Sequence, residues 1–169
     1  MHRPDEVSEN RLEDDAPYLL LTPGPLTTST SVKRAMLRDL STWDADYNEI
    51  VQTIRRELVA IAGGDDDVTA VLVQGSGTFA VEATLGSVVP RRGKLLVVSN
   101  GAYGSRMTQI AQRLRLECAE IACSETETVD PAAIDAALAN DAAITHVALV
   151  HCETTTGILN DAAAVGEVV

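Results

Sequence analysis

The 169-residue sequence predicts an α/β fold of three layers, in which a mostly parallel sheet has helices on both faces. Short apolar runs rich in β-branched residues alternate along the chain with longer segments whose apolar residues recur at helical spacing. Polar loops follow three of the apolar runs, and parallel α/β sheets bind their ligands beside the carboxyl ends of the strands. We therefore expect these three loops to meet at one edge of the sheet.

Composition restricts the classes of protein to which the chain can belong. Hydrophobic residues make up 46% of the sequence, and the formal net charge is −12. This acidic balance argues against nucleic acid as a partner, because non-specific binding to nucleic acid needs clustered Lys and Arg. No apolar run reaches the roughly 20 residues that span a bilayer, so no membrane association is expected. The first ten residues lack the apolar stretch of a signal peptide.

Neither the cysteines nor the aspartate cluster indicates a metal site. Cys118, Cys123 and Cys152 show no CxxC spacing, and we expect reduced thiols of a cytoplasmic protein. Asp65–Asp67 are adjacent in one short turn, from which three carboxylates cannot converge on an ion. We expect a solvated turn at these residues.

The first part of the chain is predicted to contain a tail, a rigid loop and two helices. Residues 1–17 are mostly charged and predict a mobile acidic tail. Thr22-Pro23-Gly24-Pro25 predicts an extended loop, because proline fixes φ and lacks a backbone donor. Helices are expected over Ser31–Leu40 and Tyr47–Ala62, and Gly63-Gly64 should end the second helix.

The most informative stretch is a strand, a glycine-rich turn and a helix. Val71–Val73 predicts a buried strand, Gln74–Thr78 favours a tight turn, and helical spacing begins at Phe79. Such a turn presents backbone N–H groups at the positive end of the helix dipole, and its hydroxyl side chains add donors. The stretch predicts a cradle for a compact phosphate monoester, since it lacks the full P-loop and dinucleotide patterns. The alternative is a turn that only ends a strand and begins a helix.

Strands and helices continue to alternate in the rest of the chain. Strands are expected over Lys94–Val98, Cys118–Ala122 and Ile144–Val150, and helices over Ser105–Leu114, Asp130–Leu138 and from Asp161 onward.

Two further polar loops, Ser99–Gly104 and His151–Gly157, follow strands of this set. Tyr103 can stack on a planar ligand, Thr154–Thr156 can donate hydroxyls to phosphate or ring oxygens, and Glu153 can orient its neighbours. The alternatives are a core tyrosine and threonines that only cap a strand end.

Five motifs in this order resemble one known family. They are L-L-L-T-P-G-P-L-T-T-S (Leu19–Ser29), T-W-D-x-D-Y (Thr42–Tyr47), Q-G-S-G-T-F-A-V-E-A (Gln74–Ala83), V-S-N-G-A-Y-G-S-R-M (Val98–Met107) and H-C-E-T-T-T-G-I-L-N (His151–Asn160). Together they closely resemble the 2-aminoethylphosphonate–pyruvate transaminase family, which are class V aminotransferases of fold-type I. The resemblance implies that residues 18–169 are the amino-terminal part of a large domain that binds pyridoxal 5′-phosphate (PLP). It also implies amino transfer from 2-aminoethylphosphonate to pyruvate, giving phosphonoacetaldehyde and alanine.

The resemblance further implies roles for particular residues. The cofactor-binding residues would be Ser76, Gly77, Thr78, Tyr103 and Thr155. The first three would bind the cofactor phosphate, Tyr103 would stack on the pyridine ring, and Thr155 would lie near the ring substituents. Thr22, Pro23, Gly24 and Pro25 would border the substrate site, often across the interface of a homodimer.

No catalytic residue is expected within this chain. The family's Schiff-base lysine, the aspartate that pairs with the pyridine nitrogen and the arginine that binds the substrate carboxylate come later than the chain end. Lys33 and Lys94 are the only lysines, and neither is expected near the loops. PLP chemistry needs that lysine, so the chain alone should not turn over. The alternatives are a related alanine–glyoxylate or serine–pyruvate aminotransferase, and a non-catalytic phosphate-binding remnant.

Overall fold

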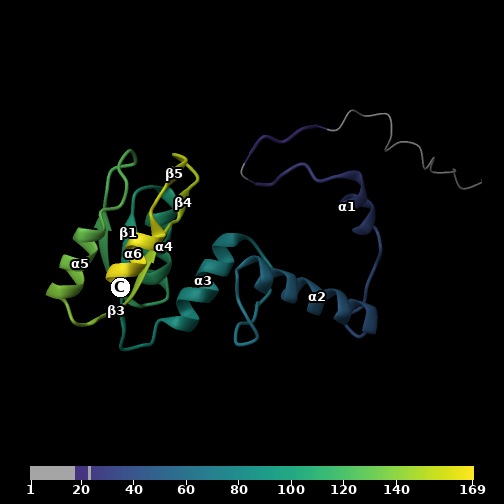
Figure 1. Cartoon of the computed structure of the whole chain (residues 1–169), viewed down its shortest axis with the longest axis horizontal. Helices are drawn as coiled ribbons and strands as arrows, with labels where there is room; N and C mark the ends of the chain where they lie inside the picture. Colours follow the sequence, from purple (N-terminus) through teal and green to yellow (C-terminus); the bar gives the residue numbers. More distant parts are fainter. Residues whose placement is uncertain (1–17, 23) are drawn as a thin grey trace, which may run out of the picture. The chain divides into compact units, whose positions relative to one another are not determined.

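Residues 18–22 and 24–169 are described by a computed structural model, which divides the chain into two compact units (Figure 1). The first unit comprises residues up to Ala70, and the second begins at Val71. The expected tail over residues 1–17 and Pro23 lie outside the described residues. No helix among the described residues is long and apolar enough to cross a membrane.

The first unit contains two helices, α1 (Thr30–Ala35) and α2 (Ala45–Ile61). α1 is shorter than the predicted helix over Ser31–Leu40. It buries none of its residues, so it lacks the tertiary packing that would stabilise further turns. α2 agrees with the prediction and ends as expected at the two glycines. The N–H groups of Gly63 and Gly64 bond to the carbonyls of Ala60 and Val59, which completes a Schellman motif with Gly63 at φ +70°.

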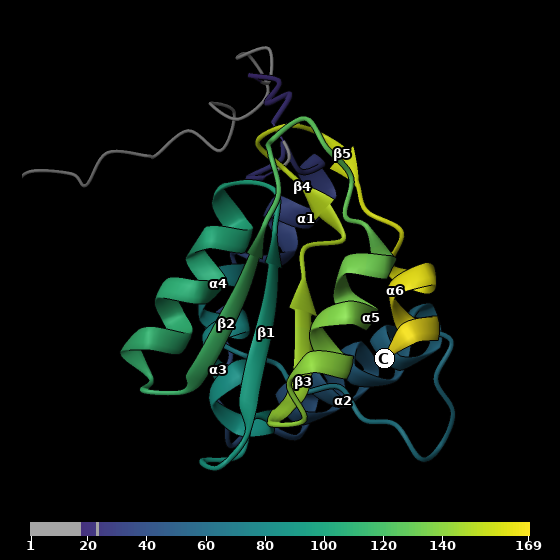
Figure 2. The same ribbon diagram turned by 90° about the vertical axis from the view of Figure 1, so that its left-hand side faces the viewer.

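The second unit contains the sheet. Its elements are α3 (Gly77–Val88), β1 (Lys94–Ser99), α4 (Ala102–Arg113), β2 (Glu117–Ala122), α5 (Pro131–Asn140), β3 (Ile144–Leu149), β4 (Cys152–Glu153), β5 (Ile158–Leu159) and α6 (Ala162–Val168). The order in the larger sheet is β2-β1-β3, and β1 pairs in parallel with both neighbours. Figure 2 shows α3 and α4 on one side of these strands and α5 and α6 on the other.

The central strand explains the three layers. Leu95 and Val97 pack with buried residues of α3 and α4, whereas Leu96 and Val98 pack with residues of α5 and α6. A strand covered on both faces needs apolar side chains at successive positions, and K-L-L-V-V-S supplies them. The predicted α/β fold, with a parallel sheet between helices, is confirmed.

The strand predicted at Val71–Val73 is wrong, because this segment has no regular structure. Val71 is 79% exposed, and no strand in the described part of the chain pairs with the segment. An apolar run becomes a strand only where a neighbouring backbone accepts and donates its hydrogen bonds. The local sequence cannot specify that neighbour.

Two loop boundaries also differ from the prediction. α4 begins at Ala102, so Tyr103 and Gly104 lie in its first turn and not in a loop. The predicted loop His151–Gly157 contains β4, which pairs with β5 in an antiparallel hairpin. Strands of two residues are too short to produce a periodic signal in a sequence.

A salt bridge closes the amino-terminal edge of the sheet. The Nζ atom of Lys94 at the start of β1 lies 2.7 Å from Oδ2 of Asp141, which follows α5. The hydrogen bond to Asp141 raises the pKa of the Lys94 ammonium, and the same bond lowers the pKa of the Asp141 carboxyl. Lys94 therefore lies at the edge opposite the loops that follow β1 and β3.

Truncating Ile134 should destabilise the second unit. Ile134 is 0% exposed within the cluster between α5 and the sheet. Ile134→Ala is expected to lower the free energy of unfolding by about 2–5 kcal/mol, measured by denaturant titration. The matched control is Ile61→Ala, at a side chain that is 83% exposed, where a change within about 0.5 kcal/mol is expected. Equal effects of the two substitutions would contradict the assigned core.

Asp141→Asn should produce a pH-dependent loss of stability. Because the folded-state pKa of Asp141 is lowered, the pair stabilises the fold above the ordinary aspartate pKa of about 3.9 and loses this effect as the pH falls. The melting temperature of the variant should fall below that of the parent at neutral pH, and the two should converge in acid. Asp135→Asn serves as the control, since Asp135 is exposed and forms no ion pair with the described residues. A difference that persists unchanged in acid would exclude the pair as its cause.

Candidate active site

The amino-terminal end of α3 has donors that its own backbone does not use. The N–H groups of Phe79 and Ala80 bond to the carbonyl of Ser76. Those of Gly77 and Thr78 donate to no backbone carbonyl among the described residues, as is usual in a first helical turn. Ser76 is the N-cap residue, but its hydroxyl makes no capping bond. Two N–H groups and a hydroxyl are thus free to bind an anion at the positive end of the helix dipole.

Two glycines keep this end of α3 accessible. Gly75 has φ +140°, and a Cβ atom there would lie 2.8 Å from Cδ1 of Phe79. A side chain at Gly75 would therefore be strained and would clash with the helix it precedes. At Gly77, by contrast, no atom lies within 4 Å of the Cβ position. The backbone is open there, so these donors remain accessible to a ligand.

Arg106 connects the cradle to Tyr103. Its Nη1 atom donates to Oγ1 of Thr78 at 3.3 Å, and its guanidinium carbon lies 5.4 Å from the centroid of the Tyr103 ring. Tyr103 remains 41% exposed. Arg106 also lines a groove of about 290 Å³ together with Thr78, Glu82 and residues of α4. The arrangement places a cation beside the donors of α3 and over one face of the tyrosine ring.

Glu153 joins Tyr103 to Thr155. Its carboxylate is fully buried, and Oε2 accepts hydrogen bonds from the N–H groups of Tyr103 (3.2 Å) and Gly104 (3.4 Å). Oε1 accepts from the hydroxyl of Thr155 at 3.0 Å and from its N–H at 3.5 Å. One side chain thus binds the first turn of α4 and the turn between β4 and β5.

Close packing at the start of α4 depends on two glycines. A Cβ atom on Gly101 would lie 2.4 Å from Cγ of Glu153, and one on Gly104 would lie 2.6 Å from Oγ of Ser99. Gly101 is extended, with φ 168°, so its requirement is the space and not the dihedral angle. These glycines allow α4 to begin directly against the end of β1.

A pair of buried asparagines supports the same edge of the sheet. Asn100, just after β1, and Asn160, just after β5, exchange two amide hydrogen bonds of 2.9 and 3.1 Å. Asn160 also accepts from the N–H of Val129 and donates to the carbonyl of Val150. The pair therefore ties the hairpin to the ends of β1 and β3.

The structure brings together most of the predicted cofactor residues. Thr78, Tyr103 and Thr155 are connected through Arg106 and Glu153, and Ser76 and Gly77 directly precede Thr78. The prediction omitted Arg106, although its spacing of three residues from Tyr103 on one helix face was a usable signal. The asparagine pair had no such signal, since its members are 60 residues apart.

The predicted substrate loop belongs to the first unit. Oγ1 of Thr22 donates to the carbonyl of Pro25 at 2.8 Å, so the described part of this loop is a closed turn. The role of this loop, including Gly24, at the border of the substrate site stays a prediction. Lys33 lies in α1 of the same unit.

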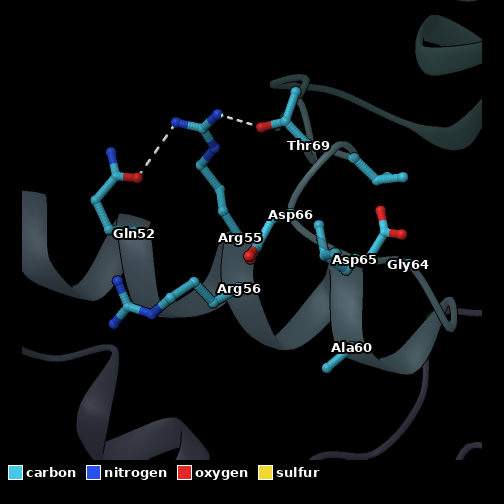
Figure 3. Close-up of a pocket in the computed structure, with 10 residues that line it drawn as sticks. Gln52, Arg55, Arg56, Ala60, Gly64, Asp65, Asp66 and Thr69 are labelled. Carbon is cyan, nitrogen blue, oxygen red and sulfur yellow. Dashed lines mark hydrogen bonds between the residues drawn. The ribbon is translucent and has the colours of Figure 1, made fainter.

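A groove of the first unit has a structural explanation. It measures about 390 Å³ and lies beside α2 and the segment that follows it (Figure 3). Arg55 donates to Oγ1 of Thr69 at 2.6 Å, to the carbonyl of Ala70 at 2.9 Å and to Gln52 at 3.3 Å. Because its donors bind the chain itself, Arg55 fixes the segment after α2. No group of His, Cys, Asp or Glu among the described residues is arranged to hold a metal ion.

Comparison with known proteins decides the family. Residues 27–169 match the family model of aminotransferase class V. The chain belongs to the class V aminotransferases. It is 59% identical over 151 residues to 2-aminoethylphosphonate–pyruvate transaminase of Klebsiella pneumoniae, and 56% identical over 153 residues to that of Syntrophobacter fumaroxidans. The alignments cover 89% and 90% of this chain and 41% of each relative, so the resemblance carried by the five motifs is confirmed.

A solved structure agrees with the fold. Alanine–glyoxylate aminotransferase from Nostoc sp. superposes with a TM-score of 0.81 and 27% identity, covering 97% of this chain and 45% of that one. This class V aminotransferase chain thus spans about two fifths of the length of the curated relatives that it matches.

Gly101→Ala should disturb the site through sterics alone. The added methyl group would overlap Glu153, and overpacking of a buried contact costs about 1–3 kcal/mol of unfolding free energy. Gly166→Ala in α6 is the control, because no atom lies within 4 Å of its Cβ position and helix propensity favours alanine by up to about 1 kcal/mol. Chemical denaturation should show the two substitutions acting in opposite directions. Stabilisation by both would show that the space beside Glu153 is not confined.

Proposed function

We propose that this chain is the cofactor-binding part of a PLP-dependent 2-aminoethylphosphonate–pyruvate transaminase. The enzyme would transfer the amino group of 2-aminoethylphosphonate to pyruvate, giving phosphonoacetaldehyde and alanine. The main support is the identity of 54–59% to transaminases of this name over 85–90% of the chain. We further propose a cytoplasmic homodimer.

The donors at the start of α3 suit the phosphate of the cofactor. In this proposal the Ser76 hydroxyl and the N–H groups of Gly77 and Thr78 bind the phosphate oxygens, and Arg106 adds positive charge beside them. Bound PLP would supply an electron sink for the amino transfer. The residues of this chain bind and orient that group.

Tyr103 and Thr155 would bind the ring of the cofactor. Tyr103 would stack on it through the ring face that Arg106 does not cover, and Thr155 would contact a ring substituent. The loop Thr22–Pro25 would border the substrate. Homodimerisation would bring this loop to the site of the partner.

The catalytic lysine would come from outside this chain. Lys94 is held by Asp141 at the amino-terminal edge of the sheet, whereas Tyr103 and Glu153 follow the carboxyl ends of the strands. The relatives are more than twice as long as the matched region, and we place the lysine in the remainder of that length.

Binding of PLP to the chain can be measured by an absorbance titration, followed by borohydride reduction and dialysis. We expect reversible binding that dialysis removes, because Lys94 is held away from the cradle. Covalent retention after reduction, mapped to Lys94 or Lys33, would contradict this arrangement. Absence of any binding would contradict the proposed cofactor site.

Removing a donor from the cradle should weaken this binding. Ser76→Ala should raise the Kd for PLP about tenfold, which is the loss of one hydrogen bond to a charged group. Ser87→Ala, in the same helix, is the matched control, since its hydroxyl bonds only to the carbonyl of Ala83. Equal Kd values for the two variants would exclude Ser76 from the site.

The choice of substrates needs a protein of the relatives' full length that includes this chain. Alanine formation from 2-aminoethylphosphonate and pyruvate should exceed glycine formation from alanine and glyoxylate. The reverse preference would favour the function named for the Nostoc structure. If the protein binds PLP but catalyses neither reaction, the result would favour a non-catalytic remnant.

A further inference from the structure

Glu153 is the most unusual side chain of the second unit. It is a carboxylate with no exposed surface, and none of the ion pairs of the described residues involves it. Burying a carboxylate is costly unless donors replace its hydration. Four donors do so here, two from the first turn of α4 and two from Thr155.

The two oxygens of Glu153 serve different elements. Oε2 receives the N–H groups of Tyr103 and Gly104, so Glu153 caps α4 from a distant segment. The N-cap residue of α4 is Gly101, which has no side chain for this purpose. Oε1 receives both donors of Thr155. The backbone of Tyr103 and the side chain of Thr155 are therefore fixed by one carboxylate.

The bond to Oε1 also determines how Thr155 can contact a ligand. A hydroxyl has one proton and two lone pairs, and a carboxylate can only accept. Because Thr155 donates its proton to Glu153, its oxygen has only lone pairs left to offer. The expectation from sequence that Thr155 donates its hydroxyl to a ligand therefore reverses.

We propose that Glu153 is a positioning residue of the cofactor site, which holds Tyr103 in place and makes Thr155 a hydrogen-bond acceptor towards the ligand. The proposal rests on the proposed function for the identity of that ligand. The partner group on the ligand would be a hydrogen-bond donor, and not a phosphate oxygen.

The substitution Glu153→Gln tests this proposal, because it preserves size but leaves only one oxygen to accept. One of the two elements must lose its bond. We expect the Kd for PLP to rise about tenfold, the absorption maximum of bound PLP to shift, and amide hydrogen exchange of Tyr103, Gly104 or Thr155 to accelerate. Glu125→Gln, at an exposed position, should leave all three readouts unchanged.

Coupling to Thr155 distinguishes positioning from general destabilisation. Thr155→Val alone should weaken PLP binding about tenfold, and the double variant should be weaker than either single one by clearly less than a further tenfold, because part of the Glu153 effect acts through Thr155. Thr155→Ser retains the hydroxyl and should bind within about threefold of the parent, given that a hydroxyl bond is what matters. Multiplying effects, about a hundredfold in the double variant, would overturn the proposal.

The failure of this proposal can be separated from failure of the proposed function. If the parent chain binds no PLP, the cofactor assignment fails, whereas the exchange of the amides still tests the hold of Glu153 on α4 and Thr155. If the parent binds PLP and Glu153→Gln binds equally well, the positioning role fails and the cofactor assignment stands. Should Glu153→Gln not fold, equal binding by Thr155→Val and Thr155→Ser would by itself overturn the role given to Thr155.

Discussion

The arrangement of the candidate site depends on one buried carboxylate, which accepts hydrogen bonds from donors of the protein in place of water. Glu153 takes the place of solvent for the start of α4 and for the turn of the β4–β5 hairpin. Its negative charge lies at the positive end of the α4 dipole, which offsets part of the cost of burial. The sheet provides the frame for this contact, since β1 and β3 end side by side and direct both segments to the same edge. Without the glycine at position 101, the carboxylate would have no room.

The site as a whole is a sequence of short contacts between elements. From α3, the contacts run through Arg106 to the ring of Tyr103, then through the backbone of α4 to Glu153 and on to Thr155. The bonds from Arg106 to Thr78 and from Tyr103 to Glu153 join groups that are distant in sequence, whereas the other two contacts are local. Such a site retains its geometry only while the parallel strands stay in register. Rigid elements, and not long loops, therefore position its donors.

Much of this organisation follows from local patterns in the sequence. The apolar run of β1, the capping aspartates Asp130 and Asp161 and the glycine stop after α2 all act within a few residues, and the structure agrees with each. The predictions that differ from the structure share another cause. Val71–Val73 has strand composition but no neighbouring strand, and the two-residue strands β4 and β5 exist only because they pair with each other. Likewise, the local sequence does not distinguish Glu153 from the polar residues beside it, because its contacts with α4 form only in the folded chain.

The asparagine pair beneath the site constrains how this protein can change. Each amide of Asn100 and Asn160 satisfies the other, and both are almost completely buried. Replacing one alone leaves a donor or an acceptor without a partner, at a cost of about 1–3 kcal/mol. Replacing both with apolar residues would spare that cost but would release Val129 and Val150 from the hairpin. A change at either position therefore alters the hydrogen bonding of the other, so the two positions are energetically coupled.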